Sequence, residues 1–198
     1  YLYSMQNIAR LWAFALGTGL LSGISCATAM DWPQWRGPNR DGISQESGWS
    51  AIWPPAGPSR LWERQLGEGC SAISVAGGRA YTMGFKAGSD RVHCLDATTG
   101  EPIWEFSYPA SLDPKLFEGG PTSTPVIHDG LVYTVSRAGE LHCLDAATGR
   151  RVWSTDWRKE FAARPPDWGY AASPLLLDQW LIAEPGAFDF VASPLRRT

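Results

Sequence analysis

The sequence predicts an all-β fold, a β-propeller of four-stranded antiparallel blades, with about two and a half blades in this chain. The first observation is an internal repeat, because residues 94–104 (CLDATTGEPIW) return 49 residues later as residues 143–153 (CLDAATGRRVW). The second is that each copy divides into four short strands rich in Val, Leu, Ile, Tyr and Trp, separated by turn residues. Four strands at a period near 50 residues are typical of one propeller blade.

The repeat extends upstream of this shared core. Residues 76–82 match residues 128–134 at an offset of 52, because the loop at 86–91 is longer than its counterpart in the second copy. A third copy begins at residues 172–178 and soon stops. Length changes confined to hairpin loops are expected between copies of one unit. The expected blades are 67–107, 122–156 and, in part, 171–186.

The second copy shows the expected strands most clearly. Asp129-Gly130 predicts a tight hairpin, because glycine reaches positive φ without steric cost. A longer turn follows, in which Asp145 and Thr148 can bond back to the turn's own amides and Gly149 can take the left-handed conformation. The four predicted strands are 124–128, 131–136, 140–145 and 151–155.

The pattern Leu-Asp-Ala-x-Thr-Gly-x-x-x-Trp carries a family resemblance. It resembles the pyrroloquinoline-quinone-type repeat of quinoprotein alcohol dehydrogenases and of an outer-membrane-assembly lipoprotein. Residues 31–42 and 167–175 are also similar to secreted quinoprotein-like repeat proteins, so the resemblance covers about 31–186. In that family the tryptophan lies on the outer strand and docks on the turn of a neighbouring blade. The resemblance assigns these structural roles to Asp96, Gly100, Trp104, Asp145, Gly149, Trp153 and Trp62.

Composition limits the classes of partner. The chain has 198 residues, of which 44% are hydrophobic and 19% charged, as in a globular protein. Its net charge is −3, and the sequence has no basic patch or long run of charge. Nucleic-acid binding is therefore not expected.

The N-terminal residues 1–29 read as a signal peptide whose natural start is Met5. Residues 11–21 form an apolar core of signal-peptide length, and residues 27–29 (ATA) fit the small-x-small cleavage rule. A membrane anchor is the alternative, although the apolar run is shorter than the ~20 residues that a span needs. Lipidation at Cys26 is a further alternative with a poorly matching motif.

Both ends of the repeat region carry segments of their own. Residues 30–66 form an N-terminal segment in which 61–66 is expected to be a strand that completes the last blade of a ring. Residues 187–198 retain no repeat feature and are expected to be a non-family tail. A closed ring at this period needs roughly 300–400 residues. We therefore expect this chain alone to aggregate or to need a further portion.

The cysteines and histidines of the repeat are expected to be structural. Cys94 and Cys143 occupy equivalent places in adjacent blades, whose sheets pack ~10 Å apart, whereas a disulfide needs Cα atoms within ~7 Å. We predict that they are unpaired and fill the core, which leaves Cys70 as a third thiol. His93 and His142 precede them and point to the opposite face of each strand, so the pairs do not converge on a metal.

The sequence names no catalytic residue, no cofactor-binding residue and no metal ligand. Family enzymes hold their quinone with calcium, a catalytic aspartate, a coordinating glutamate and asparagine, and often a disulfide between adjacent cysteines. This sequence has no adjacent cysteines, and Asp96 and Asp145 are better explained as turn residues than as calcium ligands. It also has no Gly-x-Ser-x-Gly motif and no phosphate-binding loop.

These observations predict an exported protein, periplasmic or extracellular, that is a non-enzymatic scaffold or binding module with no cofactor in this chain. Its partner is an unknown protein or polymer, and it meets the membrane only through the signal peptide. The alternative is a fragment of a dehydrogenase whose pyrroloquinoline quinone and calcium site lies in missing blades. Trp168 and Tyr170 are candidate surface contacts, or else they fill the seam between blades. A carbohydrate-binding role for exposed tryptophans is a third hypothesis.

Overall fold

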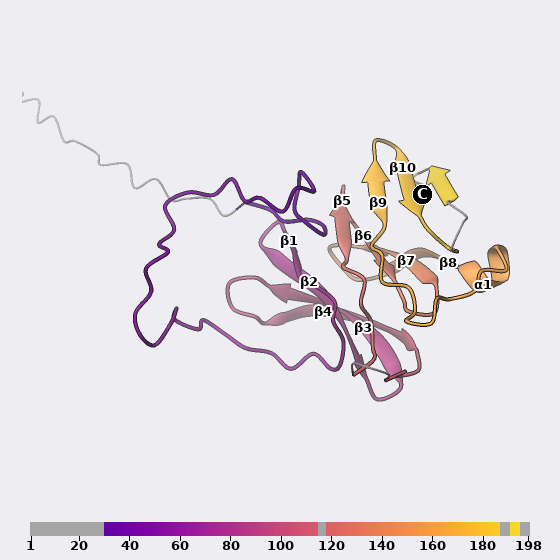
Figure 1. Cartoon of the computed structure of the whole chain (residues 1–198), viewed down its shortest axis with the longest axis horizontal. Coiled ribbons are helices and arrows are strands. Elements are labelled where there is room, and N and C mark those ends of the chain that lie inside the picture. Colours follow the sequence, from indigo (N-terminus) through magenta and orange to yellow (C-terminus); the bar gives the residue numbers. More distant parts are fainter. Residues whose placement is uncertain (1–29, 115–117, 187–190, 195–198) are drawn as a thin grey trace, which may run out of the picture.

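The computed structural model describes residues 30–114, 118–186 and 191–194. The predicted signal peptide, residues 1–29, lies outside them. The described chain forms two four-stranded antiparallel sheets and one three-stranded sheet, which follow one another in space as they do in sequence (Figure 1). The fold is that of a partial β-propeller in which each sheet is a blade.

The strand order in each sheet matches the order in the chain. The first sheet consists of β1 (Ser74–Ala76), β2 (Arg79–Lys86), β3 (Ser89–Asp96) and β4 (Pro102–Pro109). The second consists of β5 (Val126–His128), β6 (Leu131–Val135), β7 (Glu140–Asp145) and β8 (Arg151–Asp156), and is followed by α1 (Trp157–Glu160). The third consists of β9 (Leu175–Leu177), β10 (Trp180–Ala183) and β11 (Val191–Pro194).

The four strands predicted in the second copy are confirmed, with differences at their ends. The first begins at Val126, because the amide of Thr124 instead donates to the Ser173 hydroxyl (2.8 Å), in the segment that leads to the third sheet. The last strand runs one residue further than predicted, to Asp156, which caps α1 through its side chain.

The two complete blades share one register. In the first, Cys94 lies opposite Tyr81 on one side and Trp104 on the other, and a β-bulge follows it. In the second, Cys143 occupies the same place and is again followed by a bulge. The sequence repeat is therefore also a repeat of backbone geometry, which brings equivalent side chains to equivalent places in successive blades.

Each hydrophobic core lies between one blade and the next. One cluster joins residues of the first sheet to Val132 and Leu144 of the second, and the other joins the second sheet to Leu176 and Leu181 of the third. In the second blade this stacking covers both faces of the middle strands, and in the first blade the segment around Leu66 covers the face that no blade meets, so the middle strands of both blades are buried along most of their length. Cys94 and Cys143 are free and fully buried in these cores, where they pack as small hydrophobic side chains.

The C-terminal tail differs from the expectation that it lacks any feature of the repeat. Residues 191–194 form β11, which pairs with β10 and supplies the third strand of the third blade. Backbone pairing needs no particular side chain, so a segment without the repeat motif can still complete a sheet. The rest of the tail, residues 187–190 and 195–198, lies outside the described residues.

The ring-completing strand predicted at residues 61–66 is not formed. The backbone of this segment crosses the first blade, and only Glu68 joins the sheet, exchanging two hydrogen bonds with Phe85 (2.9 and 2.7 Å). A strand requires a neighbouring strand for its amides and carbonyls, and this segment lies beside none.

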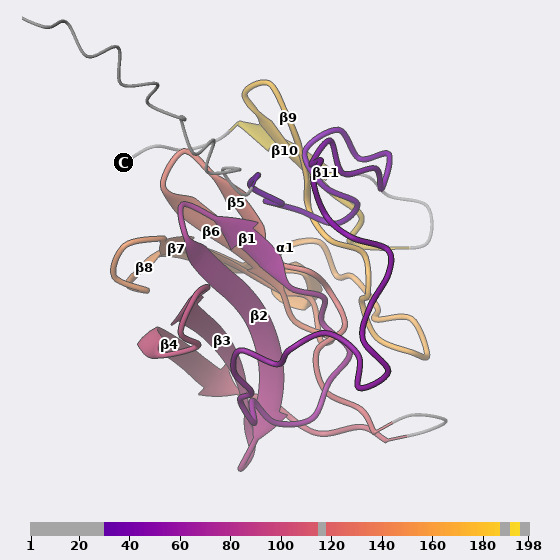
Figure 2. The same ribbon diagram turned by 90° about the vertical axis from the view of Figure 1, so that its left-hand side faces the viewer.

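The N-terminal segment runs across the inner strands of all three blades (Figure 2). Trp32 forms an antiparallel bridge with β1, and the carbonyl of Pro33 accepts from the amide of Ile127 in β5 (2.8 Å). The guanidinium of Arg40 donates to the carbonyl of Leu176 in β9. Residues 32–40 therefore cover the edges of the blades that face the axis of the propeller.

Among the residues that the structure describes, no helix is long and apolar enough to cross a membrane.

Candidate functional site

The two carboxylates of the repeat motif hold their own turns. Asp96 accepts hydrogen bonds from the amides of Thr98 and Thr99 (2.9 and 2.8 Å), and Asp145 accepts from the amide and hydroxyl of Thr148 (2.8 and 2.7 Å). The amide of Thr99 lowers the pKa of Asp96, and the hydroxyl of Thr148 lowers that of Asp145. Both side chains therefore hold the backbone of their own turns.

The tryptophan of the first blade docks on the turn of the second. The indole Nε1 of Trp104 donates to the carbonyl of Ala146 (3.0 Å), and its ring covers Gly149. A Cβ atom on Gly149 would lie 2.6 Å from that ring, and the residue has a φ of +72°. Only glycine meets both conditions, so this contact determines the residue type in the turn.

Trp62 makes the same contact on the turn of the first blade, although it lies on no strand. Its indole donates to the carbonyl of Ala97 (3.1 Å), and its ring covers Gly100, where a Cβ would lie 2.5 Å away. Arg64 adds a hydrogen bond to the carbonyl of Gly100 (2.8 Å). The N-terminal segment thus occupies the place that the outer strand of a preceding blade would take.

Trp153 differs from these two tryptophans. It packs on Tyr133 with ring centroids 6.1 Å apart and an interplanar angle of 54°, as Trp104 packs on Tyr81 (5.9 Å, 54°). Its Nε1 is nevertheless buried without a hydrogen-bond partner. A buried unsatisfied N–H is costly, so this indole marks an incomplete seam on the outer side of the second blade.

A pocket of about 530 Å³ lies between the first and second blades. Its walls come from both blades and the segment that follows them: the start of β3, the end of β4, the β6–β7 turn, α1 and the loop at 165–169. Its charged lining residues are Asp90, Asp113, Glu140, Asp167, Arg137 and Arg158. Segments about 50 residues apart in the sequence therefore meet at one site.

Asp90 and Tyr108 are buried side chains of this pocket, each with a raised pKa. Asp90 is 3% exposed, and burial raises its pKa to about 6, with the charge of Glu140 adding to the rise and Tyr108 and Arg137 opposing it. Tyr108 is 7% exposed, and its hydroxyl interacts with the Asp90 carboxyl group without forming a well-aligned hydrogen bond. Burial and the negative charge of Asp90 raise the pKa of Tyr108 well above its usual value.

Arg137 forms hydrogen bonds to two loops of the pocket wall. Its Nε and Nη2 donate to the carbonyl of Trp168 (3.2 and 2.9 Å), and its Nη1 donates to the carbonyl of Asp113 (2.9 Å). Nη2 also lies 3.5 Å from the Asp113 carboxylate. The loop that carries Trp168 is therefore held by its backbone, while the indole itself is 48% exposed.

Tyr170 corrects one prediction, since it is not a surface contact. It is 5% exposed, its ring meets Trp157 edge to face (5.0 Å, 89°), and its hydroxyl donates to the carbonyl of Pro185. It fills the seam between the second and third blades, the alternative left open by the sequence. A large aromatic ring gains more from this burial than from exposure.

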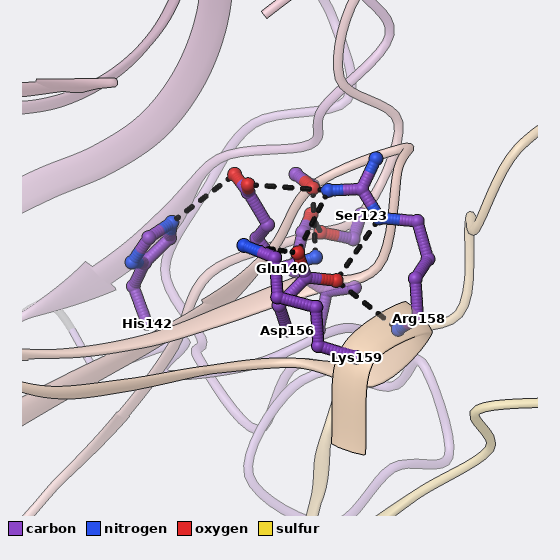
Figure 3. A network of polar contacts seen from close by, with 8 residues as sticks. Ser123, Glu140, His142, Asp156, Arg158 and Lys159 are labelled. Atoms are coloured by element: carbon purple, nitrogen blue, oxygen red, sulfur yellow. Dashed lines mark hydrogen bonds and ion pairs between the residues drawn. The ribbon is translucent and has the colours of Figure 1, made fainter. Parts of the chain in front are cut away.

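An ion-pair network extends from the pocket into α1 (Figure 3). Glu140 lies between His142 (3.9 Å) and Arg158 (3.4 Å), and Arg158 also contacts Asp156 through two atoms (both 3.0 Å). Lys159 lies 3.2 Å from the same aspartate. Arg158 above all lowers the pKa of Asp156 far below its usual value, so this carboxylate is charged at all ordinary pH values.

The repeat histidines face away from the cysteines, as predicted. His142 packs on Tyr108 and Phe106 of the first blade, at ring distances of 4.3 and 5.3 Å, whereas Cys143 belongs to the core facing the third blade. Burial lowers the pKa of His142 to about 4. His93 contacts the carbonyl of Leu66 (3.3 Å). Both histidines therefore lie at seams between structural segments.

Sequence reasoning did not find the pocket. An aspartate such as Asp90, beside a hairpin, resembles an exposed turn residue, and nothing in its neighbours indicates burial. Its position is determined by the approach of the second blade, whose β6–β7 turn covers it. The tryptophan contacts were easier to anticipate, because their pattern recurs along the chain.

The geometry defines a class of protein, namely a propeller repeat protein in which a tryptophan of one segment packs on the glycine turn of the next blade. A family model described as "Outer membrane protein assembly factor BamB" matches residues 46–120 and 110–186. The chain belongs to this family of PQQ-like propeller repeats. A search of curated proteins finds no match.

Solved structures are similar to the chain at low identity. They include BamB from Moraxella catarrhalis (18% identity, 62% of this chain and 32% of that chain, TM-score 0.44). Others are quinohemoprotein alcohol dehydrogenases. The one from Comamonas testosteroni has 21% identity over 77% of this chain and 22% of that chain, with a TM-score of 0.48. The one from Pseudomonas putida HK5 has 20% identity over 67% of this chain and 20% of that chain, with a TM-score of 0.49. The chain spans a third or less of the length of these proteins.

The calcium that accompanies the quinone in the family's enzymes needs a cluster of oxygen ligands. Within 30–114, 118–186 and 191–194, no three His, Cys, Asp or Glu side chains are grouped so as to hold a metal ion. The axis-facing edges of β1 and β5 are bonded to the chain's own Trp32 and Pro33. We derive no chemical step through this cofactor.

Proposed function

We propose that this chain is an exported, non-enzymatic propeller repeat protein that acts as a scaffold or binding module for a protein or polymer. The observation that carries the proposal is the rim of the inter-blade pocket. There Arg137 holds the backbone of a loop with two hydrogen bonds, and Trp168, whose indole is 48% exposed, lies in the sequence between the pocket-lining Asp167 and Gly169. Rigidly held, exposed aromatic side chains are favoured anchors of binding surfaces.

The repeat motif supports the scaffold part of the proposal. Asp96 and Asp145 hold turns, and Trp62 and Trp104 join segments across seams. These residues are therefore used for architecture rather than for chemistry. Export rests on the signal-peptide pattern of residues 1–29.

The buried N–H of Trp153 supports a scaffold whose third blade is completed by a further turn and strand. Trp62 and Trp104 each donate to an alanine carbonyl in a neighbouring turn, and Trp153 has the same packing without that acceptor. We infer that another Asp-x-x-Thr-Gly turn would satisfy it. A soluble 198-residue monomer that melts cooperatively, with no further portion present, would contradict the inference.

Site-specific photo-crosslinking tests the binding surface. A photoreactive phenylalanine derivative replaces Trp168 in the protein expressed in bacteria, and the same derivative replaces Trp49 of the N-terminal segment, which is more exposed (72% against 48%), as the control. We expect one reproducible adduct from position 168 and none from position 49. Equal labelling from both positions, or none from 168, would refute the proposed surface.

The dehydrogenase alternative is tested separately. Pyrroloquinoline quinone and Ca²⁺ are added to the protein, and quenching of tryptophan fluorescence and reduction of an acceptor dye by ethanol are followed. The non-enzymatic proposal expects neither saturable quenching nor dye reduction. Saturable quenching together with dye reduction would replace it by the dehydrogenase.

A further inference from the structure

We propose that the pocket between the first two blades binds an organic cation, a primary ammonium or guanidinium group, with the Asp90 carboxylate as its charged partner. The inference rests on the proposed binding function and adds a ligand class to it. It is carried by two buried polar side chains, by the charge of the lining and by the apolar walls beside them.

Asp90 is a buried carboxyl group that lacks a close countercharge. It lies second in β3 and lines the pocket while being 3% exposed. Arg137 acts on it through space, but the hydrogen bonds of that guanidinium go to Asp113 and Trp168. Burying a carboxylate without a partner is costly, and here the cost is seen as a pKa raised to about 6. A bound cation would remove that cost.

Tyr108 supplies a second polar group at the same place. It lines the pocket from the end of β4 and is 7% exposed, and its hydroxyl interacts with the Asp90 carboxyl group and lowers the pKa of that group, without forming a well-aligned hydrogen bond. A phenol oxygen can accept a hydrogen bond from an ammonium or guanidinium group, and the ring can stabilise a cation that lies over it. Asp90 and Tyr108, which lie opposite one another on β3 and β4, therefore place a carboxylate and a phenol side by side in the pocket lining.

The charge of the lining favours a cation over an anion. Four carboxylates and two guanidinium groups line the pocket. Both guanidinium groups are engaged within the protein, since Arg137 holds the two loops and Arg158 is paired with Asp156 and Glu140. Asp113 and Glu140 are themselves partners of these guanidinium groups, so the charge available to a ligand is that of the buried Asp90, and a negative charge there attracts a positive ligand. The carboxylates are Asp90, Asp113, Glu140 and Asp167.

The other walls suit an aliphatic stem. Pro109, Ala110, Ala138, Pro165 and Pro166 line the pocket together with the charged groups. The long side chains of lysine and arginine bury their methylene groups against apolar surface and direct the charge to a polar end. The volume, about 530 Å³, falls within the range of ligand pockets and accommodates such a side chain with its backbone.

Isothermal titration calorimetry at pH 8 tests the proposal. The probes are Nα-acetyl-lysine methylamide and butylammonium, and the neutral controls are Nα-acetyl-norleucine methylamide and 1-butanol. We expect both cations to bind and both neutral controls to fail. Asp90→Asn should weaken cation binding about tenfold or more, because hydrogen bonds to charged groups are the stronger kind. Glu160→Gln, on an exposed residue of α1 outside the pocket lining, changes net charge equally and should leave affinity within about twofold.

The outcomes separate the sources of the cation and the two proposals. Tighter binding of the lysine derivative than of butylammonium assigns the pocket to a protein side chain, and equal affinity assigns it to a free amine. Unchanged affinity in Asp90→Asn, or equal binding of the neutral controls, would overturn the cation site. An adduct at position 168 in a protein that binds no cation would leave the proposed function standing and remove only this inference.

Discussion

Replacing Gly149 by alanine tests the seam between the first two blades. Gly149 has a φ of +72°, and a Cβ there would lie 2.6 Å from the Trp104 ring. Gly130 is the matched control, because it has a φ of +76° with nothing within 4 Å of an added Cβ. The backbone cost of an alanine at positive φ, about 1–2 kcal/mol, is therefore common to both variants.

The excess destabilisation of Gly149→Ala comes from the displacement of Trp104. The indole must move out of its contact, which breaks the hydrogen bond to Ala146 (3.0 Å) at a cost of about 1 kcal/mol. Loss of part of its buried surface adds about 1–2 kcal/mol. Gly149→Ala should thus lower the free energy of unfolding by about 2–3 kcal/mol more than Gly130→Ala.

Urea unfolding followed by circular dichroism and tryptophan fluorescence measures the difference. A double-mutant cycle with Trp104→Leu adds a second check, because the excess should disappear once the ring is absent. If Gly149→Ala and Gly130→Ala differ by less than about 0.5 kcal/mol, the close contact of the tryptophan does not stabilise the seam.

Three further predictions concern buried polar groups. The pKa of Asp90 is raised to about 6, so folding favours its neutral form, and the stability that this form contributes is lost as the pH rises through that value. Asp90→Asn should therefore be more stable than the wild type by up to about 3 kcal/mol at pH 8 and little changed at pH 4. Urea titrations at both pH values would show this difference. The pKa of His142 is lowered to about 4, so folding favours the neutral ring, and stability is lost as the pH falls from about 6.5 to 4. His142→Phe should remove up to about 3 kcal/mol of that loss. An unchanged dependence of the unfolding free energy on pH in this range would contradict the prediction. Trp153→Phe should cost about 1 kcal/mol less than Trp104→Phe in thermal unfolding, because the Trp153 N–H has no partner to lose, and equal costs would refute that difference.

The two titrations oppose one another between about pH 4 and 6.5. Asp90 weakens the fold as it ionises, and His142 weakens it as it becomes protonated. The wild type should therefore show a shallow pH dependence that hides two larger ones. Each single substitution would reveal the other slope, which a measurement on the wild type alone would miss.

The repeat made much of the architecture predictable. The strands around Asp129-Gly130, the carboxylate-held turn at Asp145 and the role of Trp104 follow from local patterns that occur twice. These features depend on residues that are close in sequence or on contacts that recur with the period of the blade. Their physics is therefore visible in a single chain.

Other features could not be decided from the sequence, because they depend on what lies beside a segment. Residues 61–66 have a strand-like sequence but no neighbouring strand to pair with, whereas residues 191–194 lack the motif and still pair with β10. Tyr170 lies in a loop, yet it is buried because Trp157 and Pro185 cover it. Backbone pairing and burial are supplied by partners, and partners are not encoded locally.

The sequence by itself determined the blade, its four strands, its turns and the tryptophans that join one blade to the next. Only the tertiary structure decided the inter-blade pocket, where Asp90 and Tyr108 of the first blade meet Arg137 and Glu140 of the second. The physical reason is that repeat contacts are set by spacing along the chain, whereas the ionisation and burial of a side chain depend on every group that surrounds it in space.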